Sequence, residues 1–515
     1  MVFGFLNLPV SAKKLILIVL LVFSFSLLFA QEINIEPGKD GFQRSIWSQR
    51  KDKTWQKKGR KTGQDKDHLV IPPESAWSIA SIILGRPGIN SITLNILSAE
   101  DIEAFVEYDK IQSPYNLITQ VHVFKGGEPV SIILDNLETN TLYKYRLRYR
   151  KPGEEKFAQG PTYQFHTQRS TGNPFTFTIQ ADSHLGTDKH CNQKLYAQTL
   201  INIQSDKPDF HVDLGDTFRA TKLHQVNQTS IEQLFRDQRN YFGLVCHSAP
   251  LFLVLGNHDN EWGWDLKSGQ NSMSAKITIA RNKYYPNPIP GGIFTGNSVQ
   301  EKTIGYPANY YAWQWGDGLF IVLDIYRHTI TNPKAEGEPW DWTLGDEQYE
   351  WLRKTLSESR EPVKCVFLHH LHGTSRGAKE LADLYEWGGQ DRKGRQMFKS
   401  KRPYWSMPVH ELLVKYGVTA VFQGHDHIFA SQDKDGVAYI TCPMPGDPGY
   451  NAYNKDAFRI GETFPNSGHV RAGVRANSLT IEYIRAFLSK DETDKQKNAM
   501  VAFSRTIQIA KTKGK

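Results

Sequence analysis

The sequence predicts a chain of two folded parts, an all-β domain followed by a larger α/β domain. Residues 68–168 consist of short alternating apolar and polar runs with turn residues between them and no convincing helix. Beyond residue 171, five short apolar runs typical of buried or half-buried strands each end in a polar motif. The length of 515 residues is also more than one ordinary domain needs.

The five polar motifs occur in one fixed order. They follow the apolar runs 175–179, 210–214, 251–255, 363–368 and 418–422. In that order they are Asp182-Ser183-His184, Gly215-Asp216, Gly256-Asn257-His258-Asp259, His369-His370 and Gly424-His425-Asp426-His427. Any one of them is a weak signal, because such short patterns also occur in turns and on surfaces. Together they indicate one site, because strands of α/β folds point their carboxyl ends into a shared crevice.

The side chains of these motifs suit metal ions. Carboxylate and amide oxygens together with imidazole nitrogens form a donor set for two borderline or hard divalent cations. Two cations about 3.5–4 Å apart can share a hydroxide, activate it near neutral pH and neutralise phosphate oxygens. A carboxylate such as Asp216 can bridge both cations because it has two oxygens and a formal charge. The neutral imidazoles and the single amide keep the negative charge of the site low, so an anionic phosphoester is not repelled.

The ordered motifs resemble the signature of the calcineurin-like metallophosphoesterases, which is D-x-H, G-D, G-N-H-[DE], H and G-H-x-H. The resemblance implies that the first metal is held by Asp182, His184 and His427 and the second by Asn257, His369 and His425, with Asp216 bridging both. The family favours the first of two adjacent histidines, so His369 is the expected ligand. His370 is then a substrate-side or packing residue, and the role of His372 stays open.

By the same resemblance, His258 binds no metal and acts on the phosphate or the leaving group. In-line attack needs a proton donor for the leaving oxygen, and an imidazole titrates close to working pH. His258 is therefore the expected general acid.

The likeness covers about residues 171–485 and implies a four-layer α/β/β/α sandwich. Residues 319–324 resemble the family's central strand, and residues 344–352 resemble the helix that commonly follows it. Asp324, at the end of that strand, could be a sixth ligand. In such a strand it is more often a structural carboxylate bonded to backbone.

One position departs from the relatives that carry a similar front domain, the purple acid phosphatases. They place a tyrosine three residues after the bridging aspartate, where this chain has Arg219, and they lack a histidine at the position of His184. A purple ferric site is therefore not expected. The guanidinium of Arg219 offers donors that could clamp a phosphate, while an exposed arginine at a helix start is an equally good interpretation.

The all-β part has the pattern of an immunoglobulin or fibronectin type III sandwich. Alternate residues of segment 143–150 are aromatic or apolar and basic, which is typical of a strand with one buried and one solvated face. Residues 137–143 resemble the tyrosine corner of such sandwiches. We expect this domain over residues 68–170 and the phosphoesterase domain, with C-terminal strands and a basic tail, over residues 171–515.

The start of the chain has the features of a signal peptide. Lys13 and Lys14 precede an uncharged run from Leu15 to Ala30, and Gln31 and Glu32 follow. The expected localisation is export to the periplasm, cell surface or medium. Leu28 fits a cleavage site poorly, so an uncleaved anchor is the alternative, and no later run is long enough to span a membrane.

The net positive charge of the chain is small, and part of it is concentrated in one segment. Loss of the two lysines within residues 1–30 lowers the formal net charge from +8 to +6, which does not imply a nucleic-acid face. Residues 31–67 form a polar basic linker, for which contact with an acidic polymer is the minority interpretation. The four cysteines allow three pairings, and Cys365 in a buried strand favours a free thiol.

Three further features carry weaker expectations. Trp262 and Trp264 either wall the pocket or pack a long loop, and residues 443–450 form a turn-rich loop near the last motif. Segments 478–487 and 501–509 have the pattern of two closing strands.

The sequence thus predicts an exported phosphoesterase with two divalent metals, Mn, Fe, Zn or a mixture, that acts on a small or polymeric phosphoester through a metal-activated hydroxide. A phosphomonoesterase is the leading interpretation. A phosphodiesterase or nucleotidase of the same fold is the alternative, and a non-catalytic surface binding protein is less consistent with the intact ligand set. Substrate, metal identity and oligomeric state are not set by these patterns.

Overall fold

The computed structural model describes residues 79–187, 190–223, 226–335 and 337–509. The predicted signal peptide, the basic linker, the first residues of the sandwich and the tail beyond residue 509 lie outside this range. Within the described residues, no helix has the length and apolarity needed to cross a membrane.

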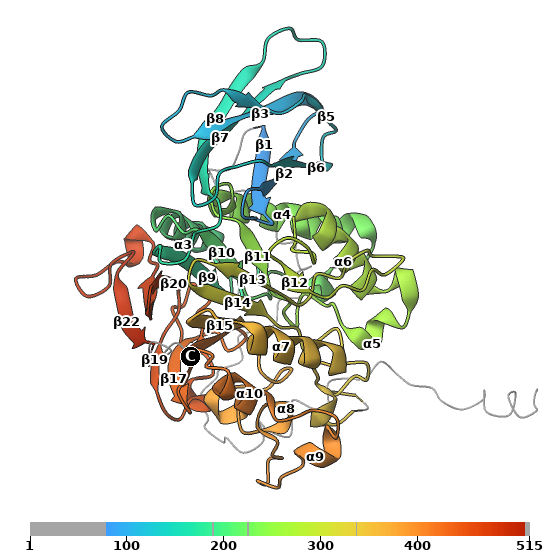
Figure 1. The fold of residues 1–515 in the computed structure, drawn as a ribbon, viewed down its shortest axis with the longest axis vertical. Helices are drawn as coiled ribbons and strands as arrows, with labels where there is room; N and C mark the ends of the chain where they lie inside the picture. The colour runs from blue at the N-terminus through green and yellow to red at the C-terminus, as the bar shows by residue number, and fades with distance from the viewer. Residues whose placement is uncertain (1–78, 188–189, 224–225, 336, 510–515) are drawn as a thin grey trace, which may run out of the picture. The chain divides into compact units, whose positions relative to one another are not determined.

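The first part of the described chain is a β-sandwich, as predicted (Figure 1). One sheet has the order β1-β2-β6 and the other β4-β3-β7-β8, with β5 paired to β3. Their bounds are β1 Ala80–Gly85, β2 Ile92–Ser98, β3 Ile102–Lys110, β4 Leu117–Ile118, β5 His122–Phe124, β6 Pro129–Leu134, β7 Leu142–Arg150 and β8 Ala158–His166. Tyr143, Tyr145 and Leu147 point into the core between these sheets. The hydroxyl of Tyr143 accepts a hydrogen bond from the amide of Glu138 at 2.8 Å, which closes the expected tyrosine corner.

The second part contains two larger sheets packed face to face. The six-stranded sheet has the order β11-β10-β9-β20-β21-β22, and the eight-stranded sheet has the order β12-β13-β14-β15-β16-β18-β17-β19. The strands of the first are β9 Phe175–Gln180, β10 Phe210–Asp213, β11 Leu251–Leu253, β20 Gly468–Arg475, β21 Ser478–Arg485 and β22 Val501–Gln508. Those of the second are β12 Thr295–Gly296, β13 Tyr311–Trp315, β14 Gly318–Val322, β15 Val363–Phe367, β16 Ala420–Gln423, β17 Phe429–Lys434, β18 Val437–Thr441 and β19 Glu462–Phe464.

Helices cover the outer face of each sheet, which gives the four layers that the resemblance implied (Figure 1). The longer helices are α3 Gln193–Ser205, α4 Gln228–Cys246, α6 Met273–Tyr284, α7 Asp346–Glu358 and α10 Val409–Lys415. Short helices are α5 Gly263–Leu266, α8 Tyr385–Gly388 and α9 Phe398–Lys401, with 3-10 turns at Ala220–Lys222, Gly269–Asn271, Pro339–Asp341, Lys379–Leu381, Lys455–Ala457 and Ser489–Asp491. Residues of α3, α4 and α6 form one outer hydrophobic cluster, and residues of α7, α8 and α10 form another.

The sequence explains why β9 lies at the centre of the first sheet. Phe175, Phe177 and Ile179 alternate with polar residues and enter the core between the two sheets. The strand is buried along most of its length because β10 pairs with it in parallel on one side and β20 in antiparallel on the other. The expected closing strands are β21 and β22, within two residues of their predicted ends.

The sandwich docks on the helical layer beside the six-stranded sheet. Ile83 and Leu97 of the sandwich belong to the same hydrophobic cluster as Phe235 and Phe242 of α4. From the same helix, the buried guanidinium of Arg239 donates to Ser81 Oγ and O, to Asn95 Oδ1 and O, and to the carbonyl of Tyr284. A mixed apolar and polar contact therefore joins the two parts.

Of the four cysteines, Cys246, Cys365 and Cys442 are buried and form no disulfide. Burial raises the pKa of each of these thiols above its ordinary value. They are therefore unreactive core residues, as expected for Cys365.

Candidate metal centre

The motif residues gather at one edge of the two sheets. Asp182 follows β9, Asp216 follows β10, Asn257 follows β11, His369 follows β15 and His425 follows β16. Because β9, β10 and β11 are parallel, as are β15 and β16, these residues leave the strands in the same direction. Left-handed φ angles between 43° and 69° occur at Asp182, His184, Asp216, His425 and His427. Such backbone is costly outside glycine and is concentrated at functional sites.

Two glycines let the second and third motifs approach each other. Gly215 has a φ of 91°, and a Cβ on it would lie 2.4 Å from the amide nitrogen of Gly256. A Cβ on Gly256 would lie 2.3 Å from the amide nitrogen of Asp216. Only glycine fits either position, and this close approach places Asp216 beside Asn257.

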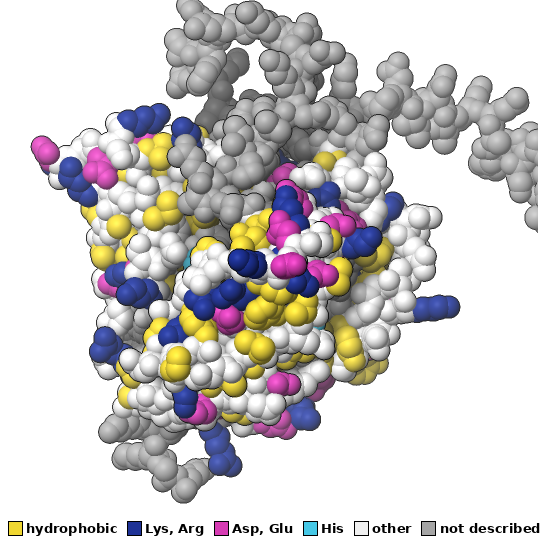
Figure 2. Space-filling model, turned by 90° about the horizontal axis from the view of Figure 1, so that it is seen from above, with side chains coloured by type: hydrophobic (Ala, Val, Ile, Leu, Met, Phe, Trp, Pro, Cys, Tyr) yellow, Lys and Arg dark blue, Asp and Glu magenta, His cyan; other side chains and the backbone are white. Residues whose placement is uncertain are grey.

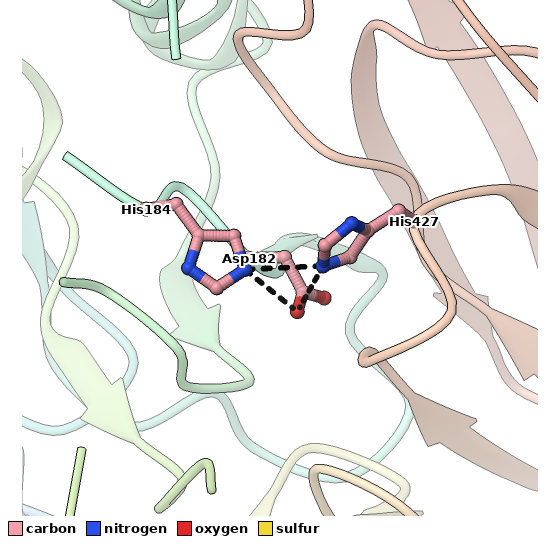
Figure 3. A group of neighbouring side chains, drawn as sticks. All are labelled: Asp182, His184 and His427. Atoms are coloured by element: carbon pink, nitrogen blue, oxygen red, sulfur yellow. Dashed lines mark hydrogen bonds and ion pairs between the residues drawn. The ribbon is translucent and has the colours of Figure 1, made fainter. Parts of the chain in front are cut away.

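The first group of donor atoms consists of Asp182, His184 and His427 (Figure 3). Asp182 Oδ1 lies 3.7 Å from His184 Nε2 and 3.3 Å from His427 Nε2, and the two ring nitrogens are 3.0 Å apart. Asp182 and His184 are fully buried, and Asp182 Oδ1 has no hydrogen-bond partner among the described residues. A buried carboxylate oxygen facing two imidazole nitrogens fits a bound cation.

The second group consists of Asp216, His369 and His425. His369 Nε2 lies 3.3 Å from Asp216 Oδ2 and 3.3 Å from His425 Nδ1. The amide oxygen Asn257 Oδ1 lies 3.2 Å from the same His369 nitrogen, so Asn257 faces this group too. Its donors are therefore two imidazoles, a carboxylate and an amide, the set that the sequence predicted.

Asp216 lies between the two groups. Its Oδ2, which belongs to the second group, is 3.9 Å from His184 Nε2 of the first. Although burial alone raises the pKa of this carboxyl, the imidazoles of His369 and His258 hold the pKa of Asp216 below its ordinary value. The carboxylate is thus charged and within reach of both groups, the position that a bridging ligand requires.

Backbone contacts fix the orientation of these side chains. His369 Nδ1 contacts the carbonyl oxygen of Leu214 at 2.8 Å, which leaves Nε2 facing the centre. The amide of His258 donates to Asp216 Oδ1 at 2.6 Å. Both bonds limit rotation of a donor group.

His370 and His372 lie outside both groups. His370 Nε2 contacts the carbonyl of Gly377 at 3.1 Å, and its Nδ1 accepts the amide of His372 at 3.2 Å, so both ring nitrogens are engaged locally. Its ring packs on that of His425, with centroids 4.6 Å apart. His372 contacts Ser375 and the carbonyl of Pro339. This geometry favours His369 over His370 as the donor.

The ring of His258 lies beside the first group, and the charge of Arg219 acts on both His258 and His184. The ring of His258 contacts that of His184 edge-on at 5.4 Å, and burial lowers its pKa, with Asp216 opposing and Arg219 reinforcing the shift. The pKa of His184 is also lowered, mainly by burial and by His427, and the charge of Arg219 adds to this shift. Arg219 Nε is buried without a hydrogen-bond partner among the described residues. The side chain of Arg219 as a whole is half-buried, and the residue directly precedes the 3-10 turn Ala220–Lys222, so the structure is compatible with both interpretations of Arg219.

Asp259 was given no role by the motif analysis, although it occupies the fourth position of Gly-Asn-His-Asp. Its carboxylate accepts hydrogen bonds from the amides of Gly256, Asp216 and Thr217 and so ties the second motif to the third. Burial raises its pKa to about 6. The acidic residue at the fourth position of Gly-Asn-His-Asp was the sequence feature from which this role could have been inferred.

Two other expectations concerned residues near the site. Asp324 accepts hydrogen bonds from the amides of Tyr326 and Arg327, which agrees with the structural interpretation of this carboxylate. Trp262 and Trp264 stack on each other with ring centroids 4.5 Å apart and pack against the core cluster under α7, which favours packing over a pocket wall.

Comparison with known proteins identifies the class. The family model of the calcineurin-like phosphoesterases matches residues 175–429, and the chain belongs to this family. It is a purple acid phosphatase-like metallophosphoesterase, and its enzyme class is that of the phosphoric ester hydrolases.

Particular relatives agree with this assignment. Tartrate-resistant acid phosphatase type 5 of Mus musculus is 23% identical over 316 residues, which cover 57% of this chain and 80% of the relative. The Rattus norvegicus protein is 25% identical over 306 residues, with the same coverage. The structure of PhoD superposes with a TM-score of 0.58 at 15% identity over 83% of this chain and 90% of that one. Purple acid phosphatase PPD1 of yellow lupin has a TM-score of 0.54 at 17% identity, over 84% and 75%. Because their sequence identity is low, these two structural matches support the fold alone.

Proposed function

We propose that this protein is a metal-dependent phosphomonoesterase whose centre holds two divalent cations. Asp182, His184 and His427 would hold the first cation, Asn257, His369 and His425 the second, and Asp216 both. The observation that carries the proposal is the position of Asp216 Oδ2, which lies 3.3 Å from a donor of the second group and 3.9 Å from a donor of the first. When bound, two cations at such a centre supply a nucleophile at neutral pH and charge neutralisation for the phosphate.

The remaining steps belong to protein side chains. His258, half-buried at the edge of the first group, would give a proton to the leaving oxygen. Arg219 would hold a phosphate oxygen through its guanidinium, because its Nε is buried with no protein acceptor among the described residues.

The alternative within the same chemistry is a phosphodiesterase or nucleotidase, for which Arg219 would supply the added contact. A binding protein without turnover is less consistent with the two complete donor groups. The similarity to acid phosphatases supports the monoesterase.

The test is hydrolysis of p-nitrophenyl phosphate and bis-p-nitrophenyl phosphate by metal-stripped protein with Mn, Zn, Fe or Ca added back. Metal-restored turnover with a preference for the monoester is expected. Preference for the diester would support the alternative, and bound metal without any turnover would overturn the proposal. Asp216→Asn should abolish turnover, whereas Asp324→Asn, which removes a carboxylate just after β14 of the other sheet, should retain it.

We also propose that the protein is exported and that the domain bounds are those given by the sequence. The basic and apolar pattern of residues 13–30 supports export. Protein recovered from the natural host should begin at Gln31 by N-terminal sequencing. An intact N-terminus in the membrane fraction would support the uncleaved anchor instead.

A further inference from the structure

A further histidine, His190, lies beside the first donor group and has no role in the proposed function. Its ring centroid is 5.6 Å from that of His184 and 5.4 Å from that of His427, and those two rings are 5.0 Å apart. The three imidazoles therefore form a nearly equilateral triangle. The donor atoms that lie within 4.8 Å of one another come from Asp182, His184 and His427, so His190 adjoins this group and is not one of its members.

Local hydrogen bonds return the chain to this position after the first motif. The hydroxyl of Thr187 donates to the carbonyl of His184 at 2.7 Å, and the amide of His190 donates to the carbonyl of Thr187 at 3.0 Å. Directly afterwards, the amide of Asn192 donates to the carbonyl of Gly446 at 2.7 Å. His190 is thus held between the first motif and the loop that follows β18.

That loop supplies the second residue of the cluster, Tyr453. Its ring contacts those of His190 and His427, both edge-on and both at 5.9 Å. The loop is anchored by Asp447, which is fully buried and accepts the amides of Gly449 and Asn451 at 3.0 and 2.7 Å. The side chain of Asn451 then donates to the Tyr453 hydroxyl at 3.1 Å. Tyr453 is therefore placed by a fixed loop.

The position of this cluster relative to solvent indicates what it contacts. In the first group the side chains of Asp182 and His184 have no exposed surface, whereas that of His427 is 11% exposed. Tyr453, which covers His427 edge-on, is itself half-buried. His427 is therefore the member of the first group with exposed surface, and the rings of His190 and Tyr453 both contact it.

We propose that His190, held by Tyr453, donates a hydrogen bond to a non-bridging phosphoryl oxygen of the bound substrate and thereby favours phosphate monoesters over diesters. A monoester presents three non-bridging oxygens that share two negative charges, so a donor on each side of the centre has a charged acceptor. A diester replaces one of these oxygens with an uncharged ester group, which is a poor acceptor. The inference rests on the proposed function and names the residue that would set its substrate class.

The test compares His190→Ala with His247→Ala. His247 directly follows α4 and also contacts an aromatic ring, since it stacks on Tyr163 of the sandwich with ring centroids 4.1 Å apart. For His190→Ala, kcat/KM for p-nitrophenyl phosphate should fall by about tenfold or more, because a hydrogen bond to a charged group is lost. The value for bis-p-nitrophenyl phosphate should fall by less than about threefold, because the neutral ester group made the weaker bond. His190→Gln, which keeps an N–H donor, should recover part of the loss, and His247→Ala should change neither value.

Two measurements that need no turnover distinguish a phosphate contact of His190 from a metal-ligand role. Calorimetric binding of inorganic phosphate to the metal-loaded protein should weaken by about tenfold in His190→Ala, while the metal content stays at the wild-type value. Loss of one metal would make His190 a ligand and would overturn the inference. Equal losses for both substrates, or no loss, would also overturn it. Wild-type protein without turnover would refute the proposed function alone, and phosphate binding would still test His190.

Discussion

The backbone amide of His425 donates a hydrogen bond of 2.7 Å to Asp182 Oδ2, across 243 residues of sequence. This bond joins the first motif to the last and occupies one oxygen of the carboxylate. The other oxygen, Oδ1, is left to face His184 and His427. Orientation of the first donor group thus depends on a contact between the two sheets.

The first prediction follows from this bond. In Asp182→Asn, the amide oxygen must accept from His425, which turns the NH2 group toward the imidazoles and repels a cation. The metal content should fall from two to one per chain, measured by inductively coupled plasma mass spectrometry. Asp324→Asn is the matched control and should keep both metals, and two metals in Asp182→Asn would contradict the assigned first group.

The second prediction separates the adjacent histidines. His369→Ala removes a donor that faces Asp216, Asn257 and His425, so it should lose the second metal and nearly all turnover. His370→Ala removes a ring that packs on His425 and contacts the carbonyl of Gly377, so metal content should stay at two and kcat should fall modestly. Metal analysis and steady-state kinetics on both variants provide the check. A reversed result would assign the ligand to His370.

The third prediction concerns the docking of the sandwich through Arg239. Burial lowers the pKa of this guanidinium to about 10, so it is charged at neutral pH and needs its acceptors. In Arg239→Ala the carbonyls of Ser81, Asn95 and Tyr284 lose a donor, and the free energy of unfolding should fall by roughly 3–5 kcal/mol. Arg236→Ala, on the same helix and 25% exposed, should cost less than about 1 kcal/mol.

Thermal unfolding by calorimetry checks this prediction. The wild-type protein should unfold with the sandwich and the α/β part coupled, and Arg239→Ala should separate or broaden the transition. Equal stability of the two arginine variants would show that the apolar contact of Ile83 and Leu97 alone holds the sandwich.

The fold was largely predictable because its signals are local. Alternating residues such as Phe175, Phe177 and Ile179 identify a strand without reference to any other segment. The pairing of β20 between β9 and β21 was not predicted, because it joins residues almost 300 positions apart and leaves no local pattern. The residues through which the sandwich docks were also not predicted, since Arg239 within an amphipathic helix has the sequence appearance of a solvated residue.

The gathering of the candidate donor residues was predictable for the same reason, since each motif follows a recognisable strand. The residues that position these donors were not predicted. Asp259 acts through backbone amides of other motifs, and His190 reaches the centre by a turn after the first motif. On the face shown in Figure 2, basic and acidic side chains are interspersed and no continuous basic surface is seen.

The last prediction uses a buried carboxyl that takes no part in the proposed chemistry. Asp213 is fully buried, and desolvation raises its pKa to about 8. Its oxygens contact the amide of Gly215 and the side-chain NH2 of Gln180, whose own Oε1 has no hydrogen-bond partner among the described residues. Rotation of the Gln180 amide would bring that oxygen to a protonated Asp213, so the neutral acid fits this environment.

Because the folded-state pKa lies above the unfolded value of about 3.9, folding favours the protonated acid. The resulting stabilisation is complete below about pH 4 and is lost as pH rises through about 8. Asp213→Asn cannot ionise, so in metal-stripped protein its Tm relative to wild type should rise steadily between about pH 5 and 8.5. The metal must be removed because nearby cations favour the ionised carboxylate of Asp213 and would reduce the pH-dependent difference in Tm between the variant and the wild type. A Tm difference that is constant over this range would show that Asp213 is already ionised in the folded protein at pH 5.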